Sequence, residues 1–218
     1  FRIPAARQGD SDFGEDHLFL YTGRGDHGAL ISYLNFMRRT IMKNGAILEK
    51  ASILKTQRLT LHPFYDADLE GAIEILCDDE IKKTFLLPDF SSREEAVKMF
   101  EALKNMSDSE EHFVYGVYLN QKLIGFINDV EIEDRIIEVG YVIHPNMKNQ
   151  GYATEMLSAS IQELFRIGYS EVKAGFFEEN QASGRVMEKS GMKIMEHTDE
   201  VEYRGKIHHC MYYSIRRP

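Results

Sequence analysis

The stretch Tyr141-Val-Ile-His-Pro-Asn-Met-Lys-Asn-Gln-Gly-Tyr-Ala-Thr-Glu155 joins a predicted strand to a predicted helix and decides how the chain folds. The strand is the apolar run 136–143, which only Glu138 and Gly140 interrupt, so we expect it to be largely buried. It ends before Pro145, because proline has no N–H to donate to a sheet. A carboxylate within such a run is costly unless it is paired or used.

The helix is predicted to begin near Tyr152, because apolar residues recur from there at the spacing of one helix face. It ends at Gly168, a residue type that favours the left-handed conformation found after many helices. The apolar positions of this face are Ala153, Met156, Leu157, Ile161, Leu164 and Phe165.

A glycine turn between a buried strand and an uncapped helix start is typical of an anion site. The first N–H groups of a helix have no partner within the helix, and the helix dipole adds positive potential there. Gly151 lets the backbone approach a ligand closely, and the small Ala153 leaves room beside it. Lys148 and the amides of residues 149–154 therefore form a candidate pyrophosphate site. The alternative is an ordinary turn in which the glycine serves only the backbone.

The residues Lys148-Asn-Gln-Gly151-Tyr-Ala153 resemble the acetyl-coenzyme A signature of the GNAT N-acetyltransferases. That signature is a basic residue or Gln, two variable residues, Gly, one variable residue, and then Gly or Ala. Lys148 is a departure, since Arg or Gln is commoner at its position. The run 151–155 and the earlier Thr56-Gln-Arg-Leu59 are similar to the subgroup that contains the RimJ/RimL-type ribosomal-protein N-terminal acetyltransferases.

A second motif opens with Asn180-Gln-Ala-Ser183 and starts a predicted helix that Gly191 ends. It resembles the family's Asn-x-x-Ser helix followed by Glu-Lys-x-Gly-Phe, with Met192 in place of the usual aromatic residue. Asn180 is a good helix N-cap, and capping alone would explain it. The resemblance also makes Asn180 a hydrogen-bond partner for the pantetheine arm of the coenzyme.

The expected order of elements is strand, two helices, three antiparallel strands, helix, strand, helix and two strands, which is the order of a GNAT domain. The expected helices other than the two already described run from Asp66 or Asp68 to Cys77 and from Ser91 or Ser92 to about Met106. The expected strands are 56–63, 112–119, 122–130, 136–143, 172–177, 192–196 and 207–216. We therefore predict an α+β (mixed α/β) fold in residues 53–218, with a central, mostly antiparallel, twisted sheet flanked by helices.

Residues 1–52 are predicted to be an N-terminal extension of unknown role with one helix at about 29–43. They include a G-x-G-x-x-G pattern at 23–28, which is typical of dinucleotide-binding folds. We reject that interpretation, because about fifty residues cannot supply the parallel strands that such a fold needs.

The composition limits the classes of molecule that the protein is expected to bind. The formal net charge of −9 disfavours nucleic acid and fits a cationic acceptor. No apolar run approaches the roughly 20 residues that span a bilayer, so no membrane partner is expected. Cys77 and Cys210 are too few for a disulfide framework, so we expect a cytoplasmic protein. Cys77 lies on or beside the apolar face of the first predicted helix and is expected to be a buried thiol. The expected assembly is a monomer or a homodimer.

No metal site is expected. His208 and His209 are adjacent on a predicted strand and so point to opposite faces, where they cannot easily share one ion. His144 follows the strand before the turn, where it could touch acceptor or cofactor or lie on the surface.

Acetyl transfer to an amine needs a base for the ammonium proton, a donor for the oxyanion and a proton for the leaving thiolate. Glu138 is the first candidate base, since it lies in the apolar strand and the resemblance places a glutamate there. Its alternative is a rim residue paired with Lys or Arg, and Glu131 and Glu133 are further candidate bases. A backbone N–H of the strand at 141–144 would meet the oxyanion.

Many family members carry a tyrosine acid in the helix after the asparagine, and Met187 stands there in this chain. The resemblance makes Ser183 the candidate proton donor, although a serine in the first turn of a helix also serves as a cap.

The resemblance implies an N-acetyltransferase that uses acetyl-coenzyme A as co-substrate and acts by direct transfer in a ternary complex. The first two helices would then frame the acceptor entrance, where Phe85, Phe90 and Phe100 would line it or simply pack in the core. The expected acceptor is a protein N-terminal α-amino group. The alternatives are a small-molecule amine (a polyamine, amino acid or antibiotic) and a catalytically silent module that binds acyl-coenzyme A. The residues implied to hold the coenzyme are Tyr141, Val142, Ile143, Lys148, Asn149, Gln150, Gly151, Tyr152, Ala153, Thr154, Asn180 and Ser183.

Overall fold

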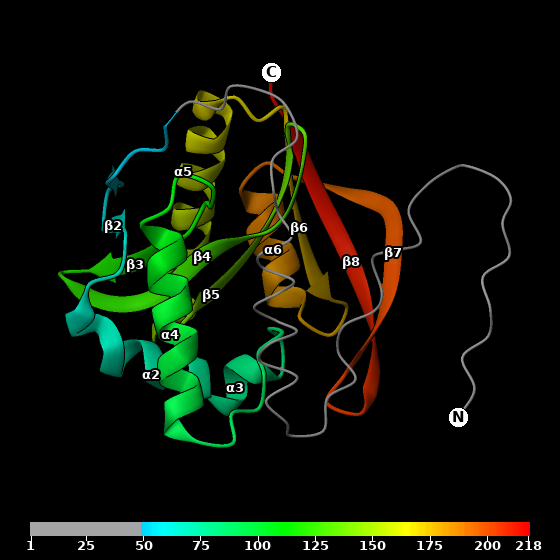
Figure 1. Cartoon of the computed structure of the whole chain (residues 1–218). Helices are drawn as coiled ribbons and strands as arrows, with labels where there is room; N and C mark the ends of the chain where they lie inside the picture. Colours follow the sequence, from blue (N-terminus) through cyan, green and yellow to red (C-terminus); the bar gives the residue numbers. More distant parts are fainter. Residues whose placement is uncertain (1–48) are drawn as a thin grey trace, which may run out of the picture.

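The computed structural model describes residues 49–218, which form one eight-stranded sheet with helices on both faces (Figure 1). The strands lie in the order β1-β2-β3-β4-β5-β6-β8-β7, and every neighbouring pair is antiparallel except β5 and β6. The predicted mixed fold with a mostly antiparallel sheet is confirmed. The strands are β1 Leu54–Lys55, β2 Leu59–His62, β3 Tyr115–Leu119, β4 Lys122–Glu133, β5 Ile136–Ile143, β6 Glu171–Phe177, β7 Lys193–Tyr203 and β8 Lys206–Arg216.

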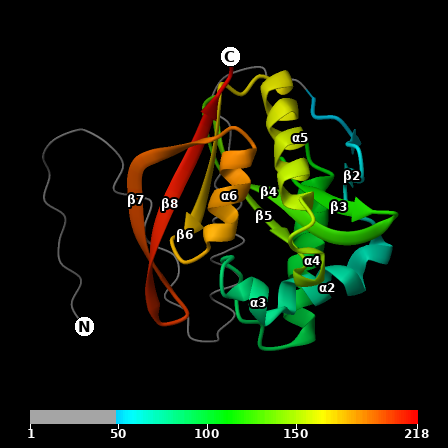
Figure 2. The same ribbon diagram turned by 180° about the vertical axis from the view of Figure 1, so that it is seen from behind.

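The helices separate into two layers because alternate side chains of a strand point to opposite faces. Helices α2 and α4 cover one face of the sheet, and α5 and α6 cover the other, as Figures 1 and 2 show from opposite sides. Each layer buries its own apolar cluster. The helical segments are η1 Asp66–Asp68, α2 Leu69–Cys77, α3 Asp79–Lys82, α4 Arg93–Ser107, η2 Pro145–Met147, α5 Tyr152–Ile167 and α6 Gln181–Lys189.

The parallel pair β5–β6 is short and opens into a wedge. Its register runs only from Ile136–Glu138 on β5 to Glu171–Lys173 on β6, whereas β5 pairs with β4 as far as Ile143 and β6 pairs with β8 as far as Phe177. Within the described residues, the sheet therefore leaves the second half of β5 without a partner on its β6 side. That gap faces the α5 N-terminus and gives the backbone groups of β5 room to bind a ligand.

Several local predictions are confirmed. Helix α5 begins at Tyr152 and is closed by Gly168, whose φ is 118°. The β3–β4 hairpin turns at Asn120 and Gln121, both left-handed, at φ 49° and 67°. Ser92 caps α4 and accepts a hydrogen bond from the Glu95 amide.

Other details differ from the expectation. Strand β7 runs on to Tyr203 instead of ending near residue 196, because it pairs with β8 along the sheet edge in spite of its many acidic residues. The short helix α3, capped by Asp78, was not expected. Cys77 is exposed rather than buried, because it is the last residue of α2 and the inward positions are Ala72, Ile75 and Leu76.

The start of the described chain is tied to the domain. Lys50 Nζ donates to the carbonyls of Ser107 (2.8 Å) and His112 (2.7 Å), and the Ala51 amide donates to Glu163 on α5 at 2.7 Å. The helix expected at 29–43 lies outside the described residues. Among residues 49–218, no helix is both long and apolar enough to cross a membrane.

Candidate active site

A cavity of about 390 Å³ occupies the wedge between β5 and β6 and continues to the α5 and α6 N-termini. It brings together all the residues predicted to bind the coenzyme except Gln150. The Gln150 side chain does not line it, and its backbone carbonyl instead accepts a hydrogen bond from Arg58 Nη1 at 2.8 Å. The predicted residues that line the cavity are Tyr141, Val142, Ile143, Lys148, Asn149, Gly151, Tyr152, Ala153, Thr154, Asn180 and Ser183.

The turn before α5 has the geometry of an anion site. Gly151 is the N-cap residue and is left-handed at φ 80°, and no side chain caps the helix. Asn149 is also left-handed, at φ 62°. The first amides of α5 are thus not occupied by a capping side chain, and the exposed Lys148 lies beside them. The predicted open helix start is confirmed.

Asn180 caps α6 and lines the cavity at the same time, so capping and ligand binding do not exclude one another. Its Oδ1 accepts from the Ser183 amide at 3.4 Å, and its Nδ2 donates to Ser183 Oγ at 2.9 Å. The Tyr141 hydroxyl, from β5, reaches across the wedge and donates to the Ser183 carbonyl at 3.3 Å. Met187, at the position where the resemblance led us to look for a tyrosine, is buried and lines the cavity.

Glu138 lies at the last paired position of the parallel strands, opposite Lys173 on β6 and Glu131 on β4. It is half-buried, and a Cβ added to Gly175, which lines the cavity, would lie 3.4 Å from Glu138 Oε1. Desolvation, followed by the charge of Glu131, raises the pKa of Glu138 to about 7, although Lys173 opposes the shift. The carboxyl group therefore titrates near neutrality at the apex of the wedge.

The other predicted candidates are less favourably placed. Glu131 lies opposite Glu138 across the strand pair, and Glu133 is exposed at the end of β4. His208 and His209 point to opposite faces, as predicted. His208 stacks on Phe177 at 4.2 Å, and His209 is exposed. Residues 49–218 contain no group of three or more His, Cys, Asp or Glu side chains that could hold a metal ion.

Sequence reasoning did not find the polar cluster of β7 and β8 beside Glu138. Tyr212 lies against Gly175, and its hydroxyl donates to Asp199 Oδ2 at 2.9 Å. The same oxygen lies 3.0 Å from His197 Nε2. Asp199 is among the charges that raise the pKa of Glu138. Only the full extent of β7 brings these residues together, and the acidic run in β7 gave no strand signal.

Of the aromatic residues expected at the acceptor entrance, Phe85 lines the cavity. Phe100 is buried in the core, where it packs edge-on against Phe64 at 5.8 Å. Phe90 packs against the same core and lies under Lys82, whose Nζ is 5.4 Å from its ring.

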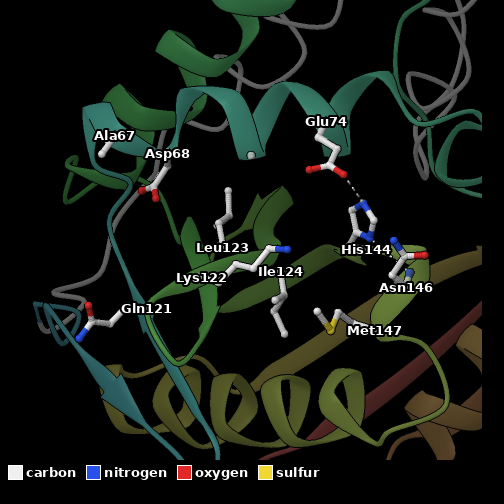
Figure 3. A pocket seen from close by; sticks show the side chains of 11 residues that line it. Ala67, Asp68, Glu74, Gln121, Lys122, Leu123, Ile124, His144, Asn146 and Met147 are labelled. Atoms are coloured by element: carbon white, nitrogen blue, oxygen red, sulfur yellow. Dashed lines mark hydrogen bonds and ion pairs between the residues drawn. The ribbon is translucent and has the colours of Figure 1, made fainter.

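A second cavity of about 260 Å³ is lined by residues of α2, β4 and η2, and Figure 3 shows the side chains that line it. It shares Met147 with the first cavity. The His144 side chain points into it, and His144 Nε2 lies 3.3 Å from Glu74 Oε1 on α2 (Figure 3). His144 thus connects η2 to α2 and does not line the first cavity.

Comparisons with known proteins agree with this geometry. Residues 58–193 match the family model described as "Acetyltransferase (GNAT) domain". The uncharacterised N-acetyltransferase YoaA of Bacillus subtilis (strain 168) is 28% identical over 172 residues, which cover 76% of this chain and 97% of the relative.

Two solved structures show the same fold. A GNAT-family acetyltransferase from Bacillus anthracis superposes with a TM-score of 0.65 at 26% identity, covering 75% of this chain and 98% of the other. The ribosomal L7/L12 alpha-N-protein acetyltransferase RimL in complex with coenzyme A gives a TM-score of 0.68 at 17% identity, covering 75% and 97%. The second likeness is one of fold alone.

Proposed function

Since the chain belongs to the GNAT acetyltransferase family, we propose that it moves an acetyl group from acetyl-coenzyme A to a primary amine, in first place the α-amino group of a protein N-terminus. The observation that carries the proposal is the cavity in the β5–β6 wedge, which ends at the open N-terminus of α5. One end offers amides and Lys148 to a pyrophosphate, and the other holds Gly175 beside the Glu138 carboxylate.

The residues present fit the coenzyme. Gly151 is left-handed at φ 80°, a backbone conformation that residues with a side chain rarely adopt, so the turn depends on glycine. The second half of β5 lies open toward the wedge and would pair with the amide groups of a pantetheine arm. Asn180 lines the same cavity and would bind that arm from α6.

Glu138 is proposed as the base. An amine attacks only when uncharged, and an α-ammonium group has a pKa of about 8 against about 10.4 for lysine. Proton transfer to a carboxylate with a pKa of about 7 is therefore uphill by about 1 unit for an α-amino group. For lysine it is uphill by more than 3 units, or about 4 to 5 kcal/mol. A base of this pKa therefore favours an acceptor amine whose pKa lies below that of a lysine side chain.

Residues of β5 and α6 are proposed to stabilise the oxyanion and to protonate the leaving thiolate. The nitrogen lone pair attacks the thioester carbonyl, and a backbone N–H of β5 in the open wedge would stabilise the oxyanion. When the tetrahedral intermediate collapses, the C–S bond breaks and the thiolate needs a proton. Ser183 Oγ accepts from Asn180 Nδ2 at 2.9 Å, so its own proton is available to pass to the thiolate while Oγ takes up the proton that the nitrogen of the intermediate gives up.

The acceptor would approach Glu138 from the polar cluster of β7 and β8. Asp199 and Glu131 add negative charge to that region and suit an incoming ammonium group. Ribosomal L7/L12 alpha-N-protein acetylation is the activity named for RimL, and its fold likeness to this chain supports a protein N-terminus as the first candidate acceptor.

The first experiment is calorimetry with acetyl-coenzyme A on the wild type and on Gly151→Glu, followed by turnover assays that detect free thiol. We expect binding that the variant loses, and faster acetylation of peptide N-termini than of polyamines or free amino acids. Faster turnover with a small amine would show that the acceptor is a small molecule and not a protein N-terminus. Binding without turnover on any amine would indicate a silent module, and no binding by the wild type would refute the proposal.

A further inference from the structure

An interlock between the segment before β2 and the first turn of α5 has no role in the proposed chemistry. Glu155 Oε1 accepts from the Thr56 hydroxyl and from the Arg58 amide at 2.7 Å, and Glu155 Oε2 accepts from Arg58 Nε at 2.7 Å. Both oxygens of one carboxylate are thus bound by a segment almost one hundred residues away in the sequence.

Arg58 also reaches the turn itself. Its Nη1 donates to the Gln150 carbonyl at 2.8 Å, and its guanidinium lies 4.5 Å from the ring centroid of Tyr152. A Cβ on Gly151 would lie 3.3 Å from Arg58 Nη2. One side chain therefore contacts Gln150 and Tyr152, the residues on either side of Gly151. Glu155, which also accepts from Thr56, holds that side chain in place.

The pairing has an electrostatic consequence. Glu155 lies in the first turn of α5, where a carboxylate stabilises the helix but repels an anion bound at the same N-terminus. Burial acts to raise the pKa of Glu155, but hydrogen bonds from Thr56 and Arg58 outweigh it and lower the pKa, so the carboxylate stays charged. Arg58 neutralises that charge next to the anion site.

We propose that Arg58 is a positioning residue for the anion turn, which it holds in shape and shields from Glu155. The proposal rests on the proposed function in taking the ligand as a pyrophosphate ester such as coenzyme A. It assigns Arg58 to the affinity for the pyrophosphate part of that ligand and not to the chemical step.

The test compares two ligands in calorimetry: coenzyme A and S-acetylpantetheine, which lacks the pyrophosphate. We expect Arg58→Gln to weaken coenzyme A binding by about tenfold or more, because charge-assisted hydrogen bonds to the turn are lost. Binding of S-acetylpantetheine and kcat at saturating acetyl-coenzyme A should stay at wild-type values. Arg58→Lys keeps the charge and should recover part of the affinity.

A double-mutant cycle checks the coupling. Glu155→Gln removes the repulsion, so Arg58→Gln should cost less in the Glu155→Gln background than in the wild type. Additive effects would contradict the proposed shielding. Arg93→Gln is the matched control, because it removes a surface ion pair of the same kind, with Glu70 on α2, away from the cavity.

Hydrogen exchange on the free protein separates this proposal from the proposed function. Arg58→Gln should speed exchange of the Glu155 amide, which donates to the Gly151 carbonyl, and of the amides in the next turn of α5 with no ligand present, whereas Arg93→Gln should not. Unchanged exchange at these amides, or equal loss of both ligands, would overturn the positioning role even if the wild type is an active enzyme. If the wild type does not bind coenzyme A but exchange is still faster in Arg58→Gln, coenzyme A is not the ligand. The effect of Arg58 on the turn would nevertheless be established.

Discussion

Glu138 shows how far a single residue can be predicted. Its position in an apolar run marks it as a functional candidate from the sequence alone, because a carboxylate there is costly. The raised pKa could not be predicted, since it depends on burial and on Glu131 and Asp199, which the strand register and the full length of β7 bring near.

The first prediction concerns Glu138→Gln and activity. A base works only when deprotonated, so wild-type kcat/KM should rise with pH through about 7. The variant should lose about 100-fold in kcat/KM and show no rise near that pH. Glu133→Gln, at the exposed end of β4, is the control and should keep the wild-type profile. A Glu138→Gln variant with the wild-type profile would exclude Glu138 as the base.

The same substitution makes a prediction for stability. The pKa of Glu138 is about 7 in the folded protein against an ordinary 4.5, so the folded state holds more protons between these values. Stability then falls as pH rises from 4.5 through 7, because deprotonation in the folded state is unfavourable. Glu138→Gln should melt above the wild type at pH 8 and close to it at pH 4. Thermal melts at both values test this, and a variant that melts lower at pH 8 would argue against a strained carboxylate.

At the scale of elements, those with strong local signals were predictable. Strand β5, the turn at Gly151, the end of α5 at Gly168 and the hairpin at 120–121 were all expected from residue type and spacing. The part of β7 beyond residue 196 was not expected, because an exposed edge strand needs no apolar alternation and its acidic residues are poor strand formers. This part of the strand forms because it pairs with β8, a long-range interaction that the local sequence does not reveal.

Helix α6 gives the third prediction, which separates the two roles of Asn180. Asn180→Ser keeps a good N-cap but loses the amide group that faces the cavity, whereas Asn180→Ala loses both. We expect Asn180→Ala to be destabilised by about 1 kcal/mol and Asn180→Ser to be near the wild type, with both binding acetyl-coenzyme A less tightly. Chemical denaturation and calorimetry measure the two effects. Normal binding by Asn180→Ser would leave Asn180 with capping alone.

At the scale of the molecule, the mostly antiparallel sheet flanked by helices was predictable, because the order of elements could be predicted from the sequence. The width of the wedge did not follow, because it depends on where the β5–β6 register ends and on how β8 pairs with β6. The face that the acceptor would use is assembled from β5, β6, β7 and β8, so it is the part of the site least visible in local sequence.

The fourth prediction concerns acceptor choice by the whole site. Peptides with a free N-terminus and no lysine should be acetylated at least about tenfold faster at pH 7 than N-blocked peptides with one lysine, because the α-amino group loses its proton more easily. Mass spectrometry of the two peptide sets would measure this. Equal rates would show that Glu138 does not discriminate by amine pKa.

The short parallel pair has one more consequence. Within residues 49–218, the strand ladder between the half that contains β1 to β5 and the half that contains β6, β8 and β7 has three register positions, Ile136–Glu171, Ile137–Val172 and Glu138–Lys173. The two halves thus meet at a narrow seam, and a long ligand lying in the wedge would touch both sides of it. Such a ligand would connect β5 and β6 non-covalently beyond Glu138, where these two strands no longer pair with each other. The substrate itself would then join the two halves of the sheet along the wedge.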